Sequence, residues 1–383
     1  MTSPSGPPQG AGGFPGQAPT QGFSAGGPQQ PPSTNGGLQQ EVHTLERAIF
    51  EVKRIIVGQD QLVERMLVGL LAKGHVLLEG VPGVAKTLAV ETFAKVVGGT
   101  FARIQFTPDL VPTDIVGTRI YRVGKEEFDI ELGPVMVNFL LADEINRAPA
   151  KVQSALLEVM AERKVSLGGK TFPLPSPFLV MATQNPIEQE GVYSLPEAQR
   201  DRFLFKLNVD YPTPEEEREI IYRMGVTPPQ PKQILNTGDL LRLQDIASGI
   251  FVHHALVDYV VRIVTATREP EKFGMPDAKS WIAYGASPRA SLGIIAASRA
   301  LALVRGRDYV IPQDVVEVIP DVLRHRLVLT YDALADEVSA ETVINRIMQT
   351  VALPQVNAIP QQGPAAGHSA PPAMPTPAAA GGR

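Results

Sequence analysis

HVLLEGVPGVAKTL, residues 75–88, is the stretch of sequence that decides the fold. Its first five residues are short and mostly apolar, as in a buried strand, and residues 88–97 show helical periodicity. Between them, residues 80–87 match the pattern G-x-x-x-x-G-K-[ST] except at position 85, where alanine replaces glycine. A loop of this kind directs backbone N–H groups and a helix N-terminus at a phosphate. The stretch therefore predicts a nucleotide-binding α/β domain.

The residue types of this loop fit the phosphates of ATP. Lys86 would neutralise the β and γ phosphates, and the Thr87 hydroxyl would bind Mg²⁺. Ala85 departs from the pattern, and its methyl group fits if the residue has helical φ and ψ at the start of the helix. The expected nucleotide contacts are Gly80, Val81, Pro82, Gly83, Val84, Ala85, Lys86, Thr87 and Leu88.

Two carboxylates follow a second buried strand, expected at 139–142. Ligands of open parallel sheets bind at the carboxyl ends of the strands, so Asp143 and Glu144 are predicted to lie beside the phosphate loop. Asp143 would hold Mg²⁺ through its water shell, and Glu144 would orient and deprotonate the attacking water. A third strand, expected at 178–182, brings the Asn185 amide to the same edge, where it can donate to the γ-phosphate.

Composition separates a folded core from two tails. Residues 1–40 contain ten Gly, eight Pro and no charged side chain, and residues 353–383 return to a Pro-rich, Ala-rich background. Such segments bury too little apolar surface to offset their conformational entropy, so both are predicted to be disordered.

The core is predicted to hold two domains. Short apolar runs that alternate with helices in residues 41–210 indicate a parallel sheet covered on both faces. Thr213 and Glu216 form a capping box signature that marks a new helix after the boundary. Further helices are expected at 255–267, 290–305 and 312–327, so residues 211–352 are predicted to form a small all-α lid domain.

Composition also limits the function. The chain has no cysteine, which excludes disulfides, zinc–thiolate sites and thiol nucleophiles. It has no apolar run of 18 residues and no secretory leader pattern, so we expect a cytoplasmic protein without a membrane span. The net charge of −5 gives no general electrostatic reason to expect nucleic acid as a partner.

The combination of motifs resembles the AAA+ ATPases and, within them, the MoxR family. The likeness covers residues 41–352. It is carried by VGQ (57–59), GVPGVAKT (80–87), LLADEINRAP (140–149), ATQNP (182–186), LPEAQRDRF (195–203) and GASPRAS (285–291). Alanine before the loop lysine is usual in that family. The resemblance implies an AAA+ fold, which is a P-loop parallel sheet with helices on both faces and a small helical lid.

The resemblance also implies roles at the nucleotide. Val57, Gly58 and Gln59 would lie against the adenine, and Asn185 would be sensor 1. Residues 119–132 and 163–172 both show the alternation of a hairpin. They look like the helix 2 insertion and the hairpin before sensor 1 in the MoxR, chelatase and MCM group, where such hairpins would touch substrate.

Arginines complete the implied site. Arg202 would be the arginine finger that reaches the γ-phosphate of a neighbouring subunit, and Arg289 would be sensor 2. Arg200 occupies a position that is commonly apolar in the family, so Arg200 and Arg202 are both candidates for the finger. Whether Arg289 serves its own site or a neighbour's stays open at this point.

The implied activity is Mg²⁺-dependent hydrolysis of ATP to ADP and phosphate. A homo-oligomeric ring, expected to be a hexamer, would use it to remodel other proteins or to insert cofactors. Von Willebrand factor A domain proteins are the implied partners. The alternatives are a chelatase-type motor subunit, an MCM-like helicase, disfavoured by the acidic composition, and a nucleotide-gated scaffold without turnover. Glu144 argues against the scaffold, because a protein that only binds ATP has no need of a general base.

Overall fold

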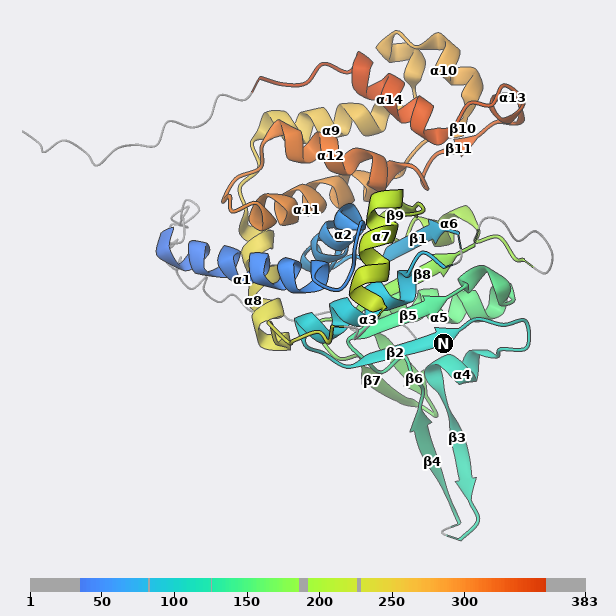
Figure 1. The fold of residues 1–383 in the computed structure, drawn as a ribbon. Coiled ribbons are helices and arrows are strands. Elements are labelled where there is room, and N and C mark those ends of the chain that lie inside the picture. The colour runs from blue at the N-terminus through green and yellow to red at the C-terminus, as the bar shows by residue number, and fades with distance from the viewer. Residues whose placement is uncertain (1–34, 82, 125, 186–191, 226–228, 356–383) are drawn as a thin grey trace, which may run out of the picture.

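A five-stranded parallel sheet forms the middle of the molecule (Figure 1). The computed structural model describes residues 35–81, 83–124, 126–185, 192–225 and 229–355. The strands, in their order across the sheet, are β2 (Phe101–Gln105), β5 (Phe139–Asp143), β8 (Leu179–Gln184), β1 (Val76–Gly80) and β9 (Phe205–Val209). Because all four pairings are parallel, the carboxyl ends form one edge of the sheet and the amino ends form the opposite edge.

The sheet is covered on both faces, as the apolar strands predicted. Phe139 and Leu141 of β5 pack into the larger core, whereas Leu140 and Ala142 pack into the smaller one. The larger core lies against α1 (Asn35–Lys53), α2 (Asp60–Leu71) and α3 (Lys86–Val97). The smaller core lies against α5 (Ala150–Glu162) and includes Ile145 of η1 (Ile145–Arg147).

Helix α1 starts at Asn35, six residues before the boundary predicted at residue 41. Leu38, Val42 and Leu45 recur at helical spacing and pack against the larger core, which explains why the helix extends into the Gly-rich segment. The rest of the N-terminal segment lies outside the described residues, as does most of the predicted C-terminal tail.

Lys73, and not Gly74, adopts the left-handed backbone after helix α2. Lys73 has the positive φ, 56°, and Gly74 N–H bonds to Gly69 O at 2.9 Å. Gly74 is required for another reason, because a Cβ there would lie 2.5 Å from Leu204.

The lid is helical apart from one short ribbon of β10 (Ile282–Tyr284) with β11 (Val328–Leu329). Its helices are α8 (Thr237–Gly249), α9 (His254–Ala266), η2 (Pro270–Phe273), α10 (Pro276–Trp281), α11 (Pro288–Val304), α12 (Pro312–Leu323), α13 (Tyr331–Ala335) and α14 (Ala340–Thr350). Helix α12 stops four residues before its predicted end, so that His325 and Arg326 leave the helix and reach the sheet domain.

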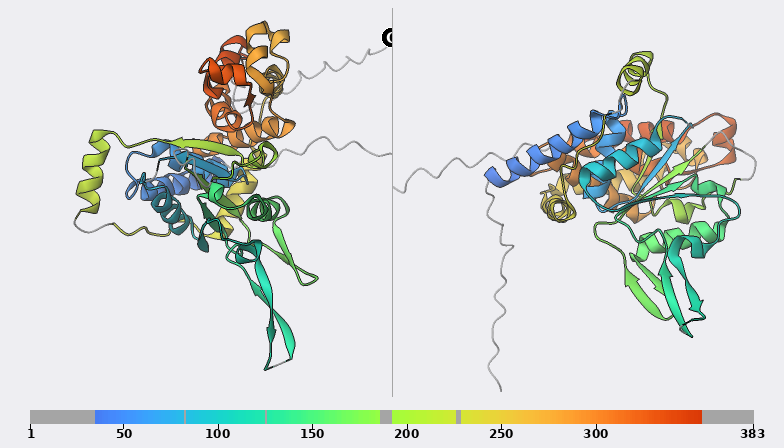
Figure 2. Two further views of the ribbon diagram at one scale, coloured as in Figure 1. Left: turned by 90° about the vertical axis from the view of Figure 1, so that its right-hand side faces the viewer. Right: turned by 60° about the horizontal axis from the view of Figure 1, so that its bottom comes forward.

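Helix α7 (Pro214–Met224) joins the two domains and begins as predicted. Thr213 Oγ1 accepts from Glu216 N–H, and Glu216 Oε2 accepts from Thr213 N–H. The helix has no buried residue, and both views of Figure 2 show it standing apart from the body.

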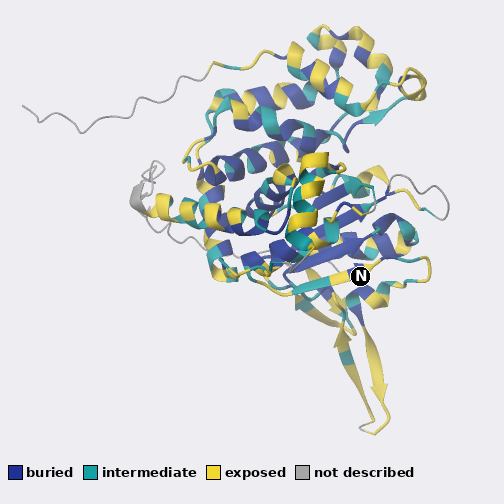
Figure 3. Cartoon of the chain, in the orientation of Figure 1, coloured by how far each residue is buried: buried dark blue, intermediate teal, exposed yellow. Residues whose placement is uncertain are grey.

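Both predicted hairpins are present. Strands β3 (Gly117–Arg122) and β4 (Glu127–Leu132) form the longer one, which follows α4 (Pro112–Val116) and projects far from the sheet domain (Figure 1). Strands β6 (Lys164–Leu167) and β7 (Lys170–Pro173) form the shorter one. Most of the longer hairpin is exposed (Figure 3).

Among the described residues, none of the helices combines the length and apolar character needed to span a bilayer.

Candidate nucleotide site

The phosphate loop connects β1 to α3 and contains two left-handed residues. Gly83 has φ +87°, with no atom near the position that a Cβ would occupy. Ala85 has φ 57° and ψ 24°, so the expectation of right-handed helical angles at this residue is wrong. The loop turns sharply into the helix at this position, which glycine would enter without strain and alanine enters at a cost of about 1 kcal/mol. Pro82, another predicted contact, lies outside the described residues.

Lys86 stands in a pocket of about 350 Å³ at the carboxyl edge of the sheet. Its Nζ donates to Gly80 O at 2.5 Å. Burial lowers the pKa of Lys86, and the nearby carboxylates, Asp143 first among them, act in the opposite direction. The pocket is lined by Gly83, Ala85, Lys86, Thr87, Leu88, Asp143, Glu144, Thr183 and Asn185, so the structure brings most of the predicted contacts together. Val81 and Val84 instead pack into the larger core.

Asp143 ends β5 and is held by two side chains that sequence reasoning missed. Arg103 Nη2 lies 2.5 Å from its Oδ2, and Thr183 Oγ1 donates to its Oδ1 at 2.6 Å. Arg103 comes from β2, the edge strand next to β5, and Thr183 comes from β8 on the other side. The carboxylate is therefore fixed from both neighbouring strands.

Glu144 has a strained backbone and a fixed side chain. Its φ of 57° and ψ of 49° are left-handed, and such outliers concentrate at functional sites. Gln105 donates to Glu144 Oε2 at 2.8 Å, and Arg147 lies 3.1 Å from the same oxygen. Arg103 and Gln105 are two residues apart on one strand and therefore lie on the same face of the sheet. This polar pair is the sequence signal that could have revealed both residues.

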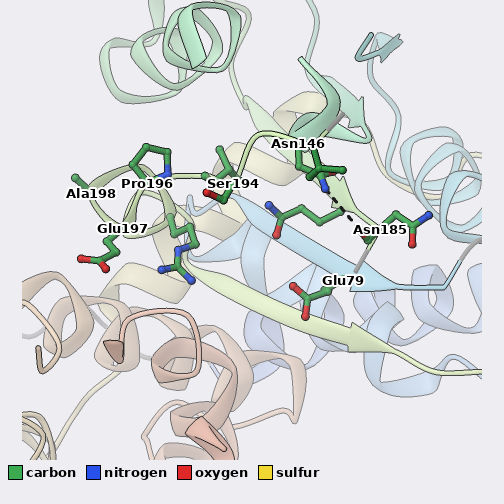
Figure 4. A pocket seen from close by; sticks show the side chains of 11 residues that line it. Glu79, Asn146, Asn185, Ser194, Pro196, Glu197 and Ala198 are labelled. Carbon is green, nitrogen blue, oxygen red and sulfur yellow. Dashed lines mark hydrogen bonds between the residues drawn. The ribbon is translucent and has the colours of Figure 1, made fainter. Parts of the chain in front are cut away.

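Asn185 follows β8, is 7% exposed, and lines both the phosphate pocket and a neighbouring one of about 730 Å³. Figure 4 shows this second pocket, where the Asn146 amide points at the Asn185 backbone. Arg200 from α6 (Glu197–Arg200) lines it together with Glu79.

The residues expected at the adenine lie near the carboxyl end of β9. Gly58 and Gln59 line a separate pocket of about 360 Å³ with Tyr211 and, from the lid, Arg324. Gln59 Nε2 donates to Asp210 O at 3.3 Å. Val57 lies just before them and does not line either this pocket or the phosphate pocket.

Arg202 and Arg289 lie at the opposite edge of the sheet. Leu204 N–H bonds to His75 O at 2.8 Å, which places Arg202 just before the amino ends of β9 and β1. The two arginines line one pocket of about 350 Å³. A strand of five residues spans roughly 16 Å, so neither arginine lies near the phosphate loop of its own chain.

The structure separates the two candidates for the finger. Arg200 faces the carboxyl edge, in the pocket beside Asn185, whereas Arg202 faces the amino edge, in the pocket that contains Arg289. Arg202 Nη1 donates to Leu157 O, and the side chain is exposed.

The residues at the carboxyl edge fit a magnesium ion. Thr87 and Asp143 place a hydroxyl and a carboxylate in the phosphate pocket, and Mg²⁺ prefers oxygen ligands and binds through one or two carboxylates plus substrate phosphates. In the part of the chain that the structure describes, no group of three or more His, Cys, Asp or Glu residues could hold a metal without such phosphates.

Comparisons with known proteins agree with this geometry. Residues 75–205 match the ATPase family associated with various cellular activities (AAA), and residues 277–347 match the AAA lid domain. The chain is 80% identical to Chaperone MoxR1 of Mycobacterium tuberculosis, over the full length of both. It is 33% identical to Protein MoxR of Paracoccus denitrificans, over 72% of this chain and 86% of that protein. A putative ATPase from Cytophaga hutchinsonii superposes with a TM-score of 0.79 at 44% identity, covering 83% of this chain and 97% of that one.

The parallel sheet with its phosphate loop, followed by a helical lid, defines a protein of the AAA+ class. Within that class, the chain belongs to the MoxR family.

Proposed function

We propose that this protein hydrolyses ATP with Mg²⁺ as a homo-oligomeric ring, a hexamer, and uses the cycle to remodel partner proteins. The observation that carries the proposal is the division of the candidate site between the two edges of one sheet. Lys86, Asp143 and Glu144 lie at the carboxyl edge, and Arg202 and Arg289 lie at the amino edge.

The residues at the carboxyl edge would bind ATP and perform the chemistry. Lys86 neutralises the β and γ phosphates, and Thr87 and Asp143 hold Mg²⁺, which offsets the negative charge of the phosphates. Glu144 takes the proton of the attacking water, once its contacts with Gln105 and Arg147 release it. Asn185 donates a hydrogen bond to the γ-phosphate.

The residues at the amino edge would complete the site of a neighbouring subunit. Arg202 and Arg289 share a pocket that their own phosphate loop does not reach, so we propose that both act on the neighbour's γ-phosphate. Such a contact joins two different surfaces of the chain, and a head-to-tail contact of this kind generates a closed ring when the rotation closes. This assigns Arg202 as the finger and gives Arg200 no part in the interface.

The partner proteins would be von Willebrand factor A domain proteins, on which the ring acts as a remodelling chaperone or inserts a cofactor. The name of the relative that is 80% identical, Chaperone MoxR1, supports the chaperone part. The projecting hairpin of β3 and β4 supports a contact surface for a client, since Tyr121 and Phe128 are 48% and 60% exposed on it.

The test is ATP turnover by the purified wild type and by Glu144→Gln, with the mass measured by light scattering with and without ATP. We expect the wild type to hydrolyse ATP and Glu144→Gln not to hydrolyse it. We also expect ATP to promote the mass of a ring in both proteins. ATP binding at monomer mass, without turnover in the wild type, would contradict the proposal and favour a nucleotide-gated scaffold.

A further inference from the structure

The pocket at the amino edge is strongly cationic. Its lining includes five basic side chains and one carboxylate, in a chain whose net charge is −5: Lys73, Arg163, Arg202, Arg289, Arg326 and Asp201. Arg326 is 8% exposed and is committed to Asp201 and to backbone carbonyl groups. The other four basic side chains are exposed, and one of them, Arg289, lies 3.5 Å from the same Asp201 carboxylate.

Two of these four residues, Lys73 and Arg163, have no part in the proposed function. Arg163 Nη2 donates to Lys73 O at 2.8 Å, so the two residues adjoin each other at the pocket wall. Lys73 lies 3.3 Å from the exposed Asp245. Among the described residues, Arg163 has no carboxylate partner, a feature that it shares with Arg202.

Both residues sit where their backbone would favour a different side chain. Lys73 has φ 56° after α2, and Arg163 has φ 52° after α5. Glycine or asparagine is usual at such left-handed positions, and another residue costs about 1 kcal/mol there. A cation does complement a helix C-terminus, but that benefit is a few tenths of a kcal/mol to about 1 kcal/mol at exposed positions. Two strained cations facing one pocket therefore suggest that the side chains are needed for a ligand.

The floor of the pocket supports this reading. His75 is buried below Arg163, accepts from Val180 N–H at 3.0 Å through Nδ1, and has Nε2 3.4 Å from Met160 O. Its pKa is lowered to about 4, first by burial and then by the charge of Arg163. The histidine is neutral near pH 7, so it adds no charge of its own to the pocket, and Asp201, which binds Arg326, is the carboxylate in the lining.

We infer that Arg163, aided by Lys73, is a further catalytic residue for ATP hydrolysis that binds the polyphosphate of the nucleotide held by a neighbouring subunit. The inference rests on the proposed function, because it requires a neighbour whose phosphates enter this pocket. A triphosphate carries about four negative charges, which a pocket with several exposed guanidinium and ammonium groups complements better than a single arginine finger would.

The experiment uses Arg163→Asn, because asparagine tolerates the left-handed backbone of this position. Lys164→Ala is the matched control, because Lys164 is the next residue in the chain and is also exposed. Its Nζ lies 3.1 Å from Glu162 Oε2. We expect Arg163→Asn to lower turnover at saturating ATP by about 10- to 100-fold, with unchanged affinity for a fluorescent ATP analogue at its own phosphate loop. Lys164→Ala should keep the parental rate, and Arg163→Lys should recover part of it.

Mixing separates action across the interface from a structural role. Arg163→Asn subunits keep an intact phosphate loop, and Glu144→Gln subunits keep an intact Arg163. Turnover should therefore rise when the two impaired proteins are combined.

The remaining outcomes are also decisive. Parental turnover in Arg163→Asn, or a loss of turnover that mixing does not repair, overturns the inference. The proposed function is unaffected by either outcome if a mixture of Arg202→Ala with Glu144→Gln is active. If the wild type has no turnover and that mixture is inactive, the proposed function fails and this inference fails with it.

Discussion

Asp201 and Arg326 join the segment that carries the candidate finger to the lid of the same chain. Arg326 Nε donates to Asp201 Oδ1 at 2.8 Å, and Ser287 Oγ donates to Oδ2 at 2.9 Å. The sequence predicts a helix over residues 312–327, which would contain Arg326, but the helix ends at Leu323. Arg326 instead binds across the domains, where its side chain is almost fully buried.

Replacing this carboxylate should loosen the lid. Asp201→Asn leaves Arg326 buried without its counter-charge, so we expect the free energy of unfolding to fall by about 2 to 3 kcal/mol in urea denaturation. The control Glu215→Gln removes an exposed partner of Arg218 and should change the free energy of unfolding by less than about 0.5 kcal/mol. Equal effects of the two substitutions would contradict the role of Asp201.

The loop lysine should control nucleotide binding. Lys86→Ala removes the charge that faces the phosphates, so we expect the affinity for ATP to fall on the order of 100-fold in a fluorescence titration. Lys95→Ala is the control on the same helix, because Lys95 is exposed and pairs with Glu91 at 2.8 Å. An unchanged affinity in Lys86→Ala would remove the phosphate-loop assignment.

The left-handed backbone of Ala85 leads to a stability prediction of unusual sign. Ala85→Gly should raise the free energy of unfolding by about 0.5 to 1 kcal/mol, because glycine adopts φ near 57° without strain. Ala161→Gly, in the last turn of α5, should lower it by about 1 kcal/mol, since glycine weakens a right-handed helix. Destabilisation by both substitutions would show that position 85 is not strained.

The arginines at the amino edge should act across the interface. Arg202→Ala and Arg289→Ala should each be inactive alone, with a loss of about 1,000-fold for the finger, and each should regain turnover when mixed with Glu144→Gln. Arg218→Ala, an exposed arginine on α7, should remain active alone. If Arg289→Ala stays inactive in the mixture, the lid arginine serves its own subunit after all.

Stability should depend on pH through His75. Its pKa is about 4 in the folded chain against an ordinary value of 6.5, so between these values the unfolded state binds more protons. The stability is complete above pH 6.5 and falls as the pH decreases to 4, by roughly 3 kcal/mol for this residue. Burial also lowers the pKa of His325, which adds to the loss in the same direction.

Urea denaturation between pH 7.5 and 4.5 measures this slope. The variant His75→Asn should show a shallower pH dependence than the wild type. The control His43→Gln, on the exposed surface of α1, should show the same dependence as the wild type. A parental slope in His75→Asn would exclude the buried histidine as its source.

Sequence reasoning located the carboxyl edge of the sheet well, because each of its residues follows a strand that is apolar on both faces. Asp143, Glu144 and Asn185 needed only that rule to be brought together. The same reasoning missed Arg103 and Gln105, whose contacts with these carboxylates depend on which strand pairs with β5. Strand order is a long-range property that no local pattern encodes.

The amino edge could not be predicted in detail. Arg200 and Arg202 are only two residues apart, and the turn after α6 sends them to opposite edges of the sheet. Lys73 and Arg163 are far apart in sequence and meet only because α2 and α5 end at the same edge. The left-handed angle of Ala85 was likewise hidden, since the residue type favours the opposite hand.

The phosphate loop and the arginines lie at opposite edges of the sheet, and this placement has a consequence for how the protein's concentration affects its activity. If the phosphate loop of one chain is completed only by the arginines of its neighbour, dilution to single chains silences the enzyme. Specific activity would then rise steeply with protein concentration, and a cell could switch the motor on by expressing more of it, with no dedicated inhibitor.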